Sequence, residues 1–321
     1  PNQQIICSGD TIIPINLSSN ITGTTYNWSV IQTNANGATN GSGSSITQTL
    51  TNNNSIQGEV LYNINSILNS CPGNSTTALV KVNPRPTVTS NSINQSICSN
   101  ENTNIILSSN LSATTFSWLV TQNNVIGALP GSGNNINQTL VNNNLIPGLA
   151  TYNVTPVDSG CIGLSLSIPV IVKPIPQLTN ISNPSICSNQ TTNIPLTSTV
   201  SGSTFSWTSI SYGPTGDSNG TGNQIAQQLQ NSGNSIGIVN YTVSPISNGC
   251  TGNPGIFSVR VLPLPKPILT DGAICVNASG SVIQNYLLDS GLGNLNHTFN
   301  WTFNGNPIPN SFQSTYLASV I

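Results

Sequence analysis

A set of anchor residues that recurs every 88 to 91 positions is the strongest constraint on this chain. A cysteine opens each of four copies, and in the first three copies a tryptophan follows it by 20 or 21 residues. A tyrosine then precedes a second cysteine by nine residues. A period of this length indicates tandem domains rather than a solenoid of short repeats. In chain order and by type, the anchors are Cys7, Cys98, Cys187 and Cys275; Trp28, Trp118, Trp207 and Trp301; Tyr62, Tyr152 and Tyr241; Cys71, Cys161 and Cys250.

These intervals predict three complete domains, over residues 1–84, 85–174 and 175–263, and part of a fourth over 264–321. The fourth copy differs, since Trp301 lies 26 residues after Cys275 and an Asn-Gly pair follows at Asn304. An Asn-Gly pair between apolar runs is typical of a tight β-hairpin. We therefore expect a divergent immunoglobulin-like domain there.

Apolar residues inside each copy alternate with polar ones, which is the pattern of half-buried strands. Phe116 and Trp118 share one face of such a strand, and Tyr152 and Val154 share a face of another. Six or seven short strands per copy, separated by Gly and Asn turns, predict an all-β fold of tandem immunoglobulin-like β-sandwiches. We expect the recurrent tryptophans and tyrosines to anchor the cores, rather than to form platforms on which sugars stack.

Prolines at alternate positions separate the copies. The separators are Val82-Asn-Pro-Arg-Pro86, Val172-Lys-Pro-Ile-Pro176 and Val261-Leu-Pro-Leu-Pro265, the last followed by Lys-Pro. Such Pro-x-Pro segments favour the extended polyproline II conformation and act as short, semi-rigid linkers. Four of the five basic residues lie at or beside these linkers, where we expect them to solvate the linkers.

Composition excludes several classes of function. Charged residues make up 4% of the chain, against about 25% in typical soluble proteins, and five basic residues cannot form a nucleic-acid surface. No apolar run approaches the roughly 20 residues that span a bilayer. The only histidine, His297, lacks the nucleophile of a catalytic set, and the seven acidic residues are scattered singly. We thus expect no enzyme activity, no cofactor and no metal. Because methionine is absent, we also expect a mature or interior piece of a longer protein.

The repeated motifs resemble a known family. The motifs are Ile97-Cys98-Ser99, Phe116-Ser-Trp118, Tyr152-Asn-Val-Thr-Pro156, Gly160-Cys161 and the Val-x-Val-x-Pro-x-Pro linker. They resemble the PKD-like and immunoglobulin-like repeats of very large surface adhesins of Bacteroidetes, including the gliding-motility adhesin. The resemblance implies a β-sandwich stalk, type IX secretion and a role at the bacterial cell surface. The Trp-Asp-Phe-Gly-Asp-Gly core of standard PKD domains is missing, since Leu119 and Val120 follow Trp118.

Seven cysteines without a metal-binding spacing point to disulfides and an oxidising, extracytoplasmic compartment. Pairing within each copy would join Cys7 to Cys71, Cys98 to Cys161, and Cys187 to Cys250. In immunoglobulin strand order, however, the two cysteines of a copy lie at opposite ends of the sandwich, at roughly 26 Å for an eight-residue strand. Bridged Cα atoms lie within about 7 Å. We therefore prefer pairs between neighbouring domains, Cys7 with Cys161 and Cys98 with Cys250. Cys71, Cys187 and Cys275 would then pair with cysteines outside this segment.

Two functions remain open. The first is a non-enzymatic structural segment of an extracellular adhesin or filament, whose partners are further copies of the domain in the same or neighbouring chains. The second is a module that binds a surface polysaccharide or another cell through sandwich loops such as residues 123–133. Exposed loop-borne tryptophan or tyrosine would favour the second. Asn-x-Ser/Thr motifs such as Asn110-Leu-Ser arise by chance in so Asn-rich a chain. Asp10-Thr11-Ile12 resembles an O-glycosylation pattern but is a single match, so neither motif decides between the two functions.

Overall fold

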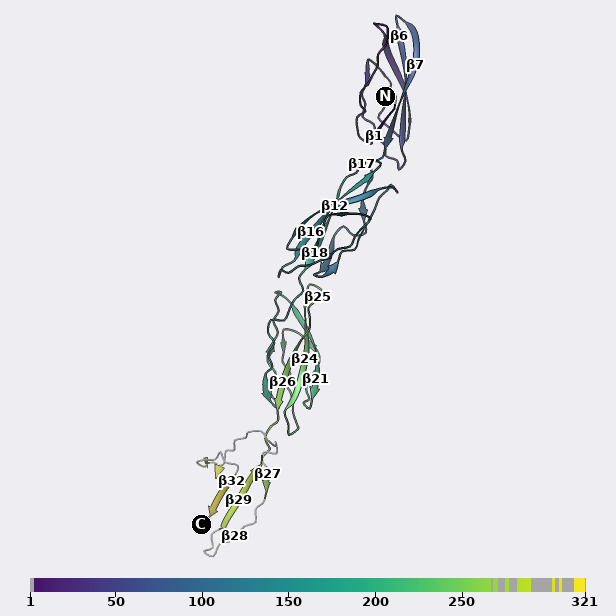
Figure 1. Cartoon of the computed structure of the whole chain (residues 1–321). Coiled ribbons are helices and arrows are strands. Elements are labelled where there is room, and N and C mark those ends of the chain that lie inside the picture. The colour runs from purple at the N-terminus through teal and green to yellow at the C-terminus, as the bar shows by residue number, and fades with distance from the viewer. Residues whose placement is uncertain are drawn as a thin grey trace. The chain divides into compact units, whose positions relative to one another are not determined.

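The computed structural model describes residues 3–266 in full and, beyond them, only the backbone of short strands (Figure 1). Those strands are β27 (Ile268–Thr270), β28 (Cys275–Val276), β29 (Val282–Asp289), β30 (Thr302–Phe303), β31 (Asn306–Pro307) and β32 (Thr315–Val320). The chain divides into two compact units, Pro1–Pro174 and Ile175–Ile321. Trp301, His297 and the side chain of Cys275 lie outside the described residues, as does most of the predicted fourth domain.

The first domain is built from two sheets. The larger has the strand order β1-β7-β6-β3-β4, and the smaller pairs β2 with β5. The first strand runs parallel to the last, with Cys7 opposite Asn83, and the other pairs are antiparallel. The strands are β1 (Gln3–Cys7), β2 (Ile15–Asn16), β3 (Thr25–Thr33), β4 (Gly41–Ser42), β5 (Ser45–Ile46), β6 (Gly58–Leu68) and β7 (Cys71–Asn83).

The second domain repeats this topology and adds strands to the smaller layer. Its larger sheet has the order β13-β12-β16-β18-β9, with β17 beside β16, and a three-stranded sheet has the order β14-β11-β8. The strands are β8 (Thr89–Ser90), β9 (Gln95–Cys98), β10 (Glu101–Asn102), β11 (Ile105–Ser108), β12 (Thr115–Asn123), β13 (Gly131–Ser132), β14 (Asn135–Ile136), β15 (Thr139–Leu140), β16 (Gly148–Asp158), β17 (Cys161–Ile162) and β18 (Leu166–Lys173).

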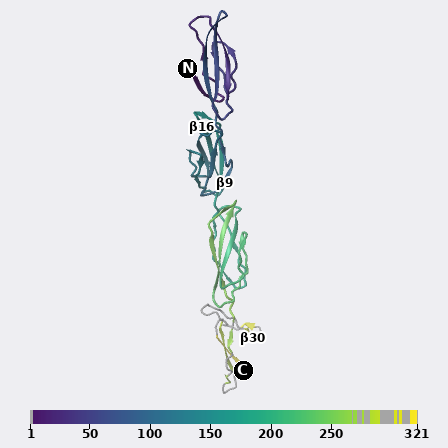
Figure 2. The same cartoon turned by 90° about the vertical axis from the view of Figure 1, so that its right-hand side faces the viewer.

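The third domain has the same plan. Its larger sheet has the order β19-β26-β24-β21-β22, with β25 beside β24, and β20 pairs with β23. Figure 2 shows the three domains in a second view, each with its long strands side by side. The strands are β19 (Ser185–Cys187), β20 (Ile194–Pro195), β21 (Thr204–Tyr212), β22 (Gly220–Thr221), β23 (Gln224–Ile225), β24 (Gly237–Ser247), β25 (Cys250–Thr251) and β26 (Gly255–Leu262).

Each domain has its own hydrophobic core between its two sheets. The period-two alternation of the long strands supplies it, because successive side chains of a strand point to opposite faces. On β16, for example, Ala150, Tyr152 and Val154 are all fully buried, and the residues between them face outward or lie at the boundary. The predicted all-β architecture of immunoglobulin-like sandwiches is therefore the observed one. No helix occurs among the described residues, and hence none long and apolar enough to cross a membrane.

Candidate functional site at the junction of the first two domains

The cysteine that opens each domain ends the strand that runs parallel to the last strand. In the first domain a tight turn follows, in which the Cys7 N–H donates to the Asp10 carboxylate at 3.2 Å and Gly9 has a φ of 85°. The Cys98 N–H bonds to Glu101 at 2.8 Å and the Cys187 N–H to Gln190 at 3.0 Å in the same way. An acceptor three residues after the cysteine therefore holds its backbone at the trailing end of the domain, the end where the chain leaves.

The second cysteine of each domain lies at the opposite, leading end. In the second domain Ser159 and Gly160 form a two-residue hairpin, with φ values of 48° and 79°, and Cys161 pairs with Asp158 across it. Positive φ at both central residues is the geometry that matches the twist of a hairpin. The hairpin therefore presents Cys161 at the end of the domain that faces the preceding linker.

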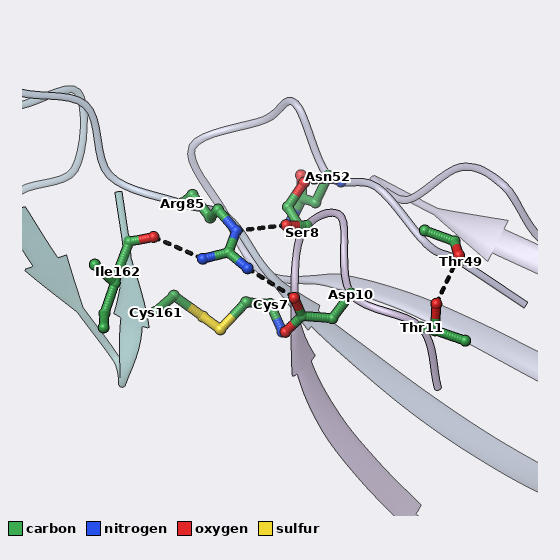
Figure 3. A network of polar contacts seen from close by, with 9 residues as sticks. All are labelled: Cys7, Ser8, Asp10, Thr11, Thr49, Asn52, Arg85, Cys161 and Ile162. Atoms are coloured by element: carbon green, nitrogen blue, oxygen red, sulfur yellow. Dashed lines mark hydrogen bonds and ion pairs between the residues drawn. A yellow bond between two sulfur atoms is a disulfide. The ribbon is translucent and has the colours of Figure 1, made fainter. Parts of the chain in front are cut away.

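A disulfide joins Cys7 of the first domain to Cys161 of the second, with a Cα–Cα distance of 5.6 Å and a sequence separation of 154 residues (Figure 3). This is the pairing between neighbours that the strand directions favour. Pairing within a copy is wrong for Cys7 with Cys71 and for Cys98 with Cys161, because Cys7 and Cys161 bond to each other. Pairing of Cys187 with Cys250 is also wrong, because Cys187 is a free, exposed thiol, as is Cys71.

The register of the sheet explains why pairing within a copy fails. Cys7 lies opposite Asn83 at the end of β7, whereas Cys71 begins the same strand. Twelve residues of strand separate the two positions, which is roughly 40 Å at about 3.3 Å per residue. The same holds in the second domain, where Cys98 lies opposite Lys173. The preferred pair Cys98–Cys250 would connect the two compact units and stays a prediction.

Arg85 of the linker binds both domains beside this disulfide (Figure 3). Its Nε donates to the Ser8 carbonyl oxygen at 2.7 Å and its Nη2 to the Asp10 carboxylate at 2.7 Å, both in the first domain. Its Nη1 donates to the Ile162 carbonyl oxygen of the second domain at 2.6 Å. The expectation that Arg85 only solvates the linker is wrong, because its planar guanidinium reaches three acceptors at once.

The linker also packs tightly against the second domain. A Cβ added at Gly163 would overlap the carbonyl oxygen of Pro86, so only glycine allows this approach. Gly252 and Pro176 have the same relationship in the third domain. Across the junction, the Asn83 side-chain amide also donates to the Ser159 carbonyl oxygen at 3.4 Å. The Pro-x-Pro segment therefore spaces the domains and is also held in place by contacts with them.

The serine after each opening cysteine ties the trailing end to the core. The Ser8 hydroxyl accepts the Asn52 N–H at 2.8 Å, and the Asn52 amide donates to the carbonyl oxygens of Ile56 and Val82 at 2.8 Å each. Equivalent bonds link Ser99 to Asn142 and Ser188 to Asn231. The asparagines are buried, and their role was not predicted from the sequence, although their spacing of 90 and 89 residues follows the repeat.

The predicted core anchors surround a glutamine whose place in the core was not predicted from the sequence. In the second domain the indole N–H of Trp118 and the side-chain amide of Gln138 both donate to the Leu129 carbonyl oxygen, at 3.1 and 2.9 Å. The Tyr152 hydroxyl donates to the Gln138 side-chain oxygen at 2.8 Å. The same set recurs as Trp28, Gln48 and Tyr62, and as Trp207, Gln227 and Tyr241. All six of these described aromatic residues are buried, which agrees with a core role.

Burial changes the acidity of the core tyrosines. Desolvation raises the pKa of Tyr62 to about 12. It also raises the pKa of Tyr152 to about 12, against a smaller lowering from the Thr103 hydrogen bond. The pKa of Tyr241 is raised by desolvation and, to a lesser extent, by the negative charge of Asp217. The phenols are therefore held neutral as hydrogen-bond donors to their glutamines.

No group of three or more potential metal ligands is present among residues 3–266. The junction brings together cysteines, an arginine, the Asp10 carboxylate, backbone carbonyls and a glycine, and their bonds join the two domains.

The profile of the PKD-like domain family matches residues 4–86, 95–176 and 184–265. The chain belongs to the PKD-like domain family. No curated protein sequence matches it. Among solved structures, it is similar to human CDH23 EC21–23, at 13% identity and a TM-score of 0.35, covering 81% of this chain and 98% of that one. It is also similar to the protocadherin gamma B7 extracellular cadherin domains 1–4, at 10% identity and a TM-score of 0.35, covering 100% and 98%. The human desmocollin-1 ectodomain matches at 13% identity and a TM-score of 0.28, with 90% of this chain and 66% of that one covered.

Proposed function

We propose that this PKD-like array is a non-enzymatic structural segment of an extracellular adhesion protein that transmits tension, and that its fixed junctions are the functional element. The observation that carries the proposal is the Cys7–Cys161 disulfide, together with the Arg85 bonds beside it. Covalent and polar links on both sides of a short linker restrict bending and twisting between neighbouring sandwiches. A binding protein that only displayed separate domains would not need such links.

The disulfide also changes the path of a pulling force. Tension applied to the ends of the chain passes from Cys7 directly to Cys161, because the covalent bond bypasses the residues between them. The 153 bypassed residues hold most of the first domain and of the second. Unfolding within this loop cannot lengthen the chain while the disulfide is intact. The array under tension therefore keeps its length even when a domain within the loop unfolds.

The same plan extends to the other cysteines. Cys98 with Cys250 would repeat the bridge at the next junction, and Cys71, Cys187 and Cys275 would bond to cysteines of further repeats. Cys71 and Cys187 support this, because both are exposed thiols at positions equivalent to Cys161 and Cys7. Partners of this kind are further PKD-like repeats, in the same chain or in neighbouring chains of a filament.

Stretching single molecules by their two ends tests the proposal. Residues 8–160 correspond to roughly 550 Å of extended chain at about 3.6 Å per residue. We expect this length to stay hidden in the oxidised chain and to appear in full after reduction. In the double variant Cys7→Ser/Cys161→Ser, residues 8–98 should extend, because the expected Cys98–Cys250 bridge would still bypass the rest. The variant Cys187→Ser, which removes a free thiol, is the matched control. Full extension of the oxidised wild-type chain would refute this structural role.

The location of the protein is part of the same proposal. A disulfide between domains forms and persists in an oxidising compartment, which supports an extracellular site. The finer assignment is a bacterial cell surface, an adhesin of the gliding-motility type and export by the type IX route. It rests on the resemblance of the repeat motifs alone. Labelling of intact cells with an impermeant thiol reagent at Cys71 or Cys187, after mild reduction of their expected bonds to further repeats, checks the surface location.

A carbohydrate-binding role is the second candidate, and one observation favours it. Tyr212, at the end of β21, is 62% exposed and lies beside a shallow depression with Asn240 and Arg260. An exposed ring next to amide and guanidinium groups is suited to sugar contacts. Glycan-array binding that is lost in Tyr212→Ala and kept in the exposed-residue control Ile256→Ala would establish it.

A further inference from the structure

The first domain has a groove where the other two domains are closed. It measures about 400 Å³ and lies along the edge of residues 15–20 that β5 leaves unpaired, opposite residues 74–78 of β7. Apolar side chains of Ile15, Leu17 and Tyr26 line it, together with the polar residues Ser18 and Asn20. No strand pairs with this edge of β2 among the described residues, since β5 occupies only the other edge.

The apolar residues of this groove have buried counterparts in the repeats. Leu17 is only partly buried, whereas its counterparts Leu107 and Leu196 are each 4% exposed. The contrast is larger for Ile21, which is 53% exposed, against 7% for Leu111 and 6% for Val200. Tyr26 is likewise partly buried, and its counterparts Phe116 and Phe205 are each 4% exposed. The groove is thus a part of the domain core that lacks its cover.

In the second domain the cover is the linker itself. Strand β8 pairs with β11, with Ser90 opposite Leu107, and Val88 packs against the core. The Thr87 N–H and hydroxyl donate to the Asn110 side-chain oxygen, at 2.8 and 2.9 Å. Asn110 is the counterpart of Asn20, which receives no such bond from a linker in the first domain.

The third domain uses the same cover. Leu178 packs against its core and forms a β-bridge with Ser198, and the Thr179 N–H donates to the Thr197 carbonyl oxygen at 3.1 Å. The covering segments share a sequence, since Pro86-Thr-Val-Thr and Pro176-Gln-Leu-Thr both read proline, polar residue, branched apolar residue, threonine. Pro267-Ile-Leu-Thr after the third domain again has proline, an apolar residue and threonine at these positions.

We infer that the groove on the first domain is the receiving site for the exit linker of a further PKD-like repeat. The Val or Leu of that linker enters the space between Ile15, Leu17 and Tyr26, and covers Ile21. Its backbone pairs with Leu17 and Ser18, directly after β2, as β8 pairs with Leu107 and Ser108. The Asn20 side-chain oxygen accepts an N–H from the residue after the second proline. Strand addition of this kind takes affinity from main-chain bonds and specificity from the alternate side chains.

This inference names a partner for the proposed array, and it rests on the proposed function only for that partner's role in a stalk. The observations on the groove, and on the covered positions that correspond to it in the other two domains, do not depend on the proposed function. The stretching experiment depends on Cys7 and Cys161 and does not involve the groove, so either proposal can fail while the other holds.

A graft of the linker tests the inference on the full chain. Residue 92 is the counterpart of Pro1, because Cys98 corresponds to Cys7. Residues 84–91 fused directly ahead of Pro1 therefore restore the spacing found in the second domain. We expect amide hydrogen exchange over residues 16–21 to slow at least tenfold, since an intramolecular strand has a high effective concentration. The same graft with Val88→Asp should leave exchange unchanged. Equal exchange rates in the grafted and ungrafted chains would overturn the inference.

A free peptide of residues 84–91 locates the binding site. Its addition to the ungrafted chain should slow exchange over residues 16–21, and Ile21→Asp should remove the effect. Ile56→Asp, at a position 60% exposed and outside the groove, is the matched control. Because Ile21 is exposed, its substitution should not unfold the domain. Protection that persists in Ile21→Asp, or that appears elsewhere in the chain, would refute the assigned site.

Discussion

The carbonyl oxygen of Pro86 lies so close to the Cα of Gly163 that no side chain fits between them. Pro86 belongs to the linker, and Gly163 follows the hairpin that carries Cys161. The contact therefore sets how closely the linker approaches the second domain. It recurs between Pro176 and Gly252, which indicates that the approach is a general property of these junctions.

Gly163→Ala should loosen the first junction. The added methyl group forces the linker or the hairpin to move, at a cost of about 1–3 kcal/mol. We expect a lower thermal unfolding temperature, and faster hydrogen exchange at Gly163, whose N–H donates to the Pro156 carbonyl oxygen at 2.9 Å. Gly73→Ala is the matched control in the first domain, because the added Cβ would first meet the movable Ser66 hydroxyl. Equal losses in the two variants would contradict a specific role for the linker contact.

Arg85→Lys should make the junction disulfide easier to reduce. A lysine ammonium is a single point charge and cannot reach the three acceptors Ser8, Asp10 and Ile162 together. The Arg85 side chain is 41% exposed, so we expect a loss of only about 1 kcal/mol, or roughly fivefold faster reduction. The rate at which dithiothreitol reduces Cys7–Cys161 measures this. Lys81→Arg, at an ion pair of 3.8 Å with Glu59, is the control for exchanging one cationic side chain for the other. An unchanged reduction rate in Arg85→Lys would show that the Arg85 hydrogen bonds do not protect the disulfide.

The core tyrosines predict a loss of stability at high pH. The folded-state pKa of Tyr152 is raised to about 12 from the usual 10.0, so the unfolded chain loses its phenolic proton first. The stabilisation that the neutral Tyr152 phenol gives to the folded state is fully present below pH 10 and is lost as the pH rises through about 12. At full effect this amounts to about 3 kcal/mol. Tyr152→Phe should flatten the fall in unfolding free energy between pH 10 and about 12 for the second domain, as followed by denaturant titration.

The exposed Tyr212 provides the matched substitution for that experiment, since Tyr212→Phe changes a side chain that is 62% exposed. The comparison separates the loss of a buried phenol from the general effect of removing one hydroxyl. If Tyr152→Phe kept the full alkaline destabilisation of the wild type, burial of the phenol would not be its cause.

The sequence determined the parts of this protein that depend on local patterns. Alternating apolar residues define the strands, and a recurring interval defines the domains, because packed sandwiches of one family place their anchors at the same distances along the chain. Strand direction also placed Cys98 and Cys161 at opposite ends of one domain, since a strand of known rise cannot fold back on itself. Strand direction therefore favours the pairing of Cys7 with Cys161 on the sequence alone.

Which groups meet across the junction and inside the cores depends on how the folded chain packs. The three acceptors of Arg85 lie 77, 75 and 77 residues away along the chain, at Ser8, Asp10 and Ile162, and no local pattern links such distant positions. Gln138 and Asn142 are amides in a chain rich in amides, so composition hides the few that are buried. The groove beside β2 becomes visible only when three folded copies are compared. In each case the deciding quantity is a distance in space between residues far apart in sequence, which packing sets and periodicity does not.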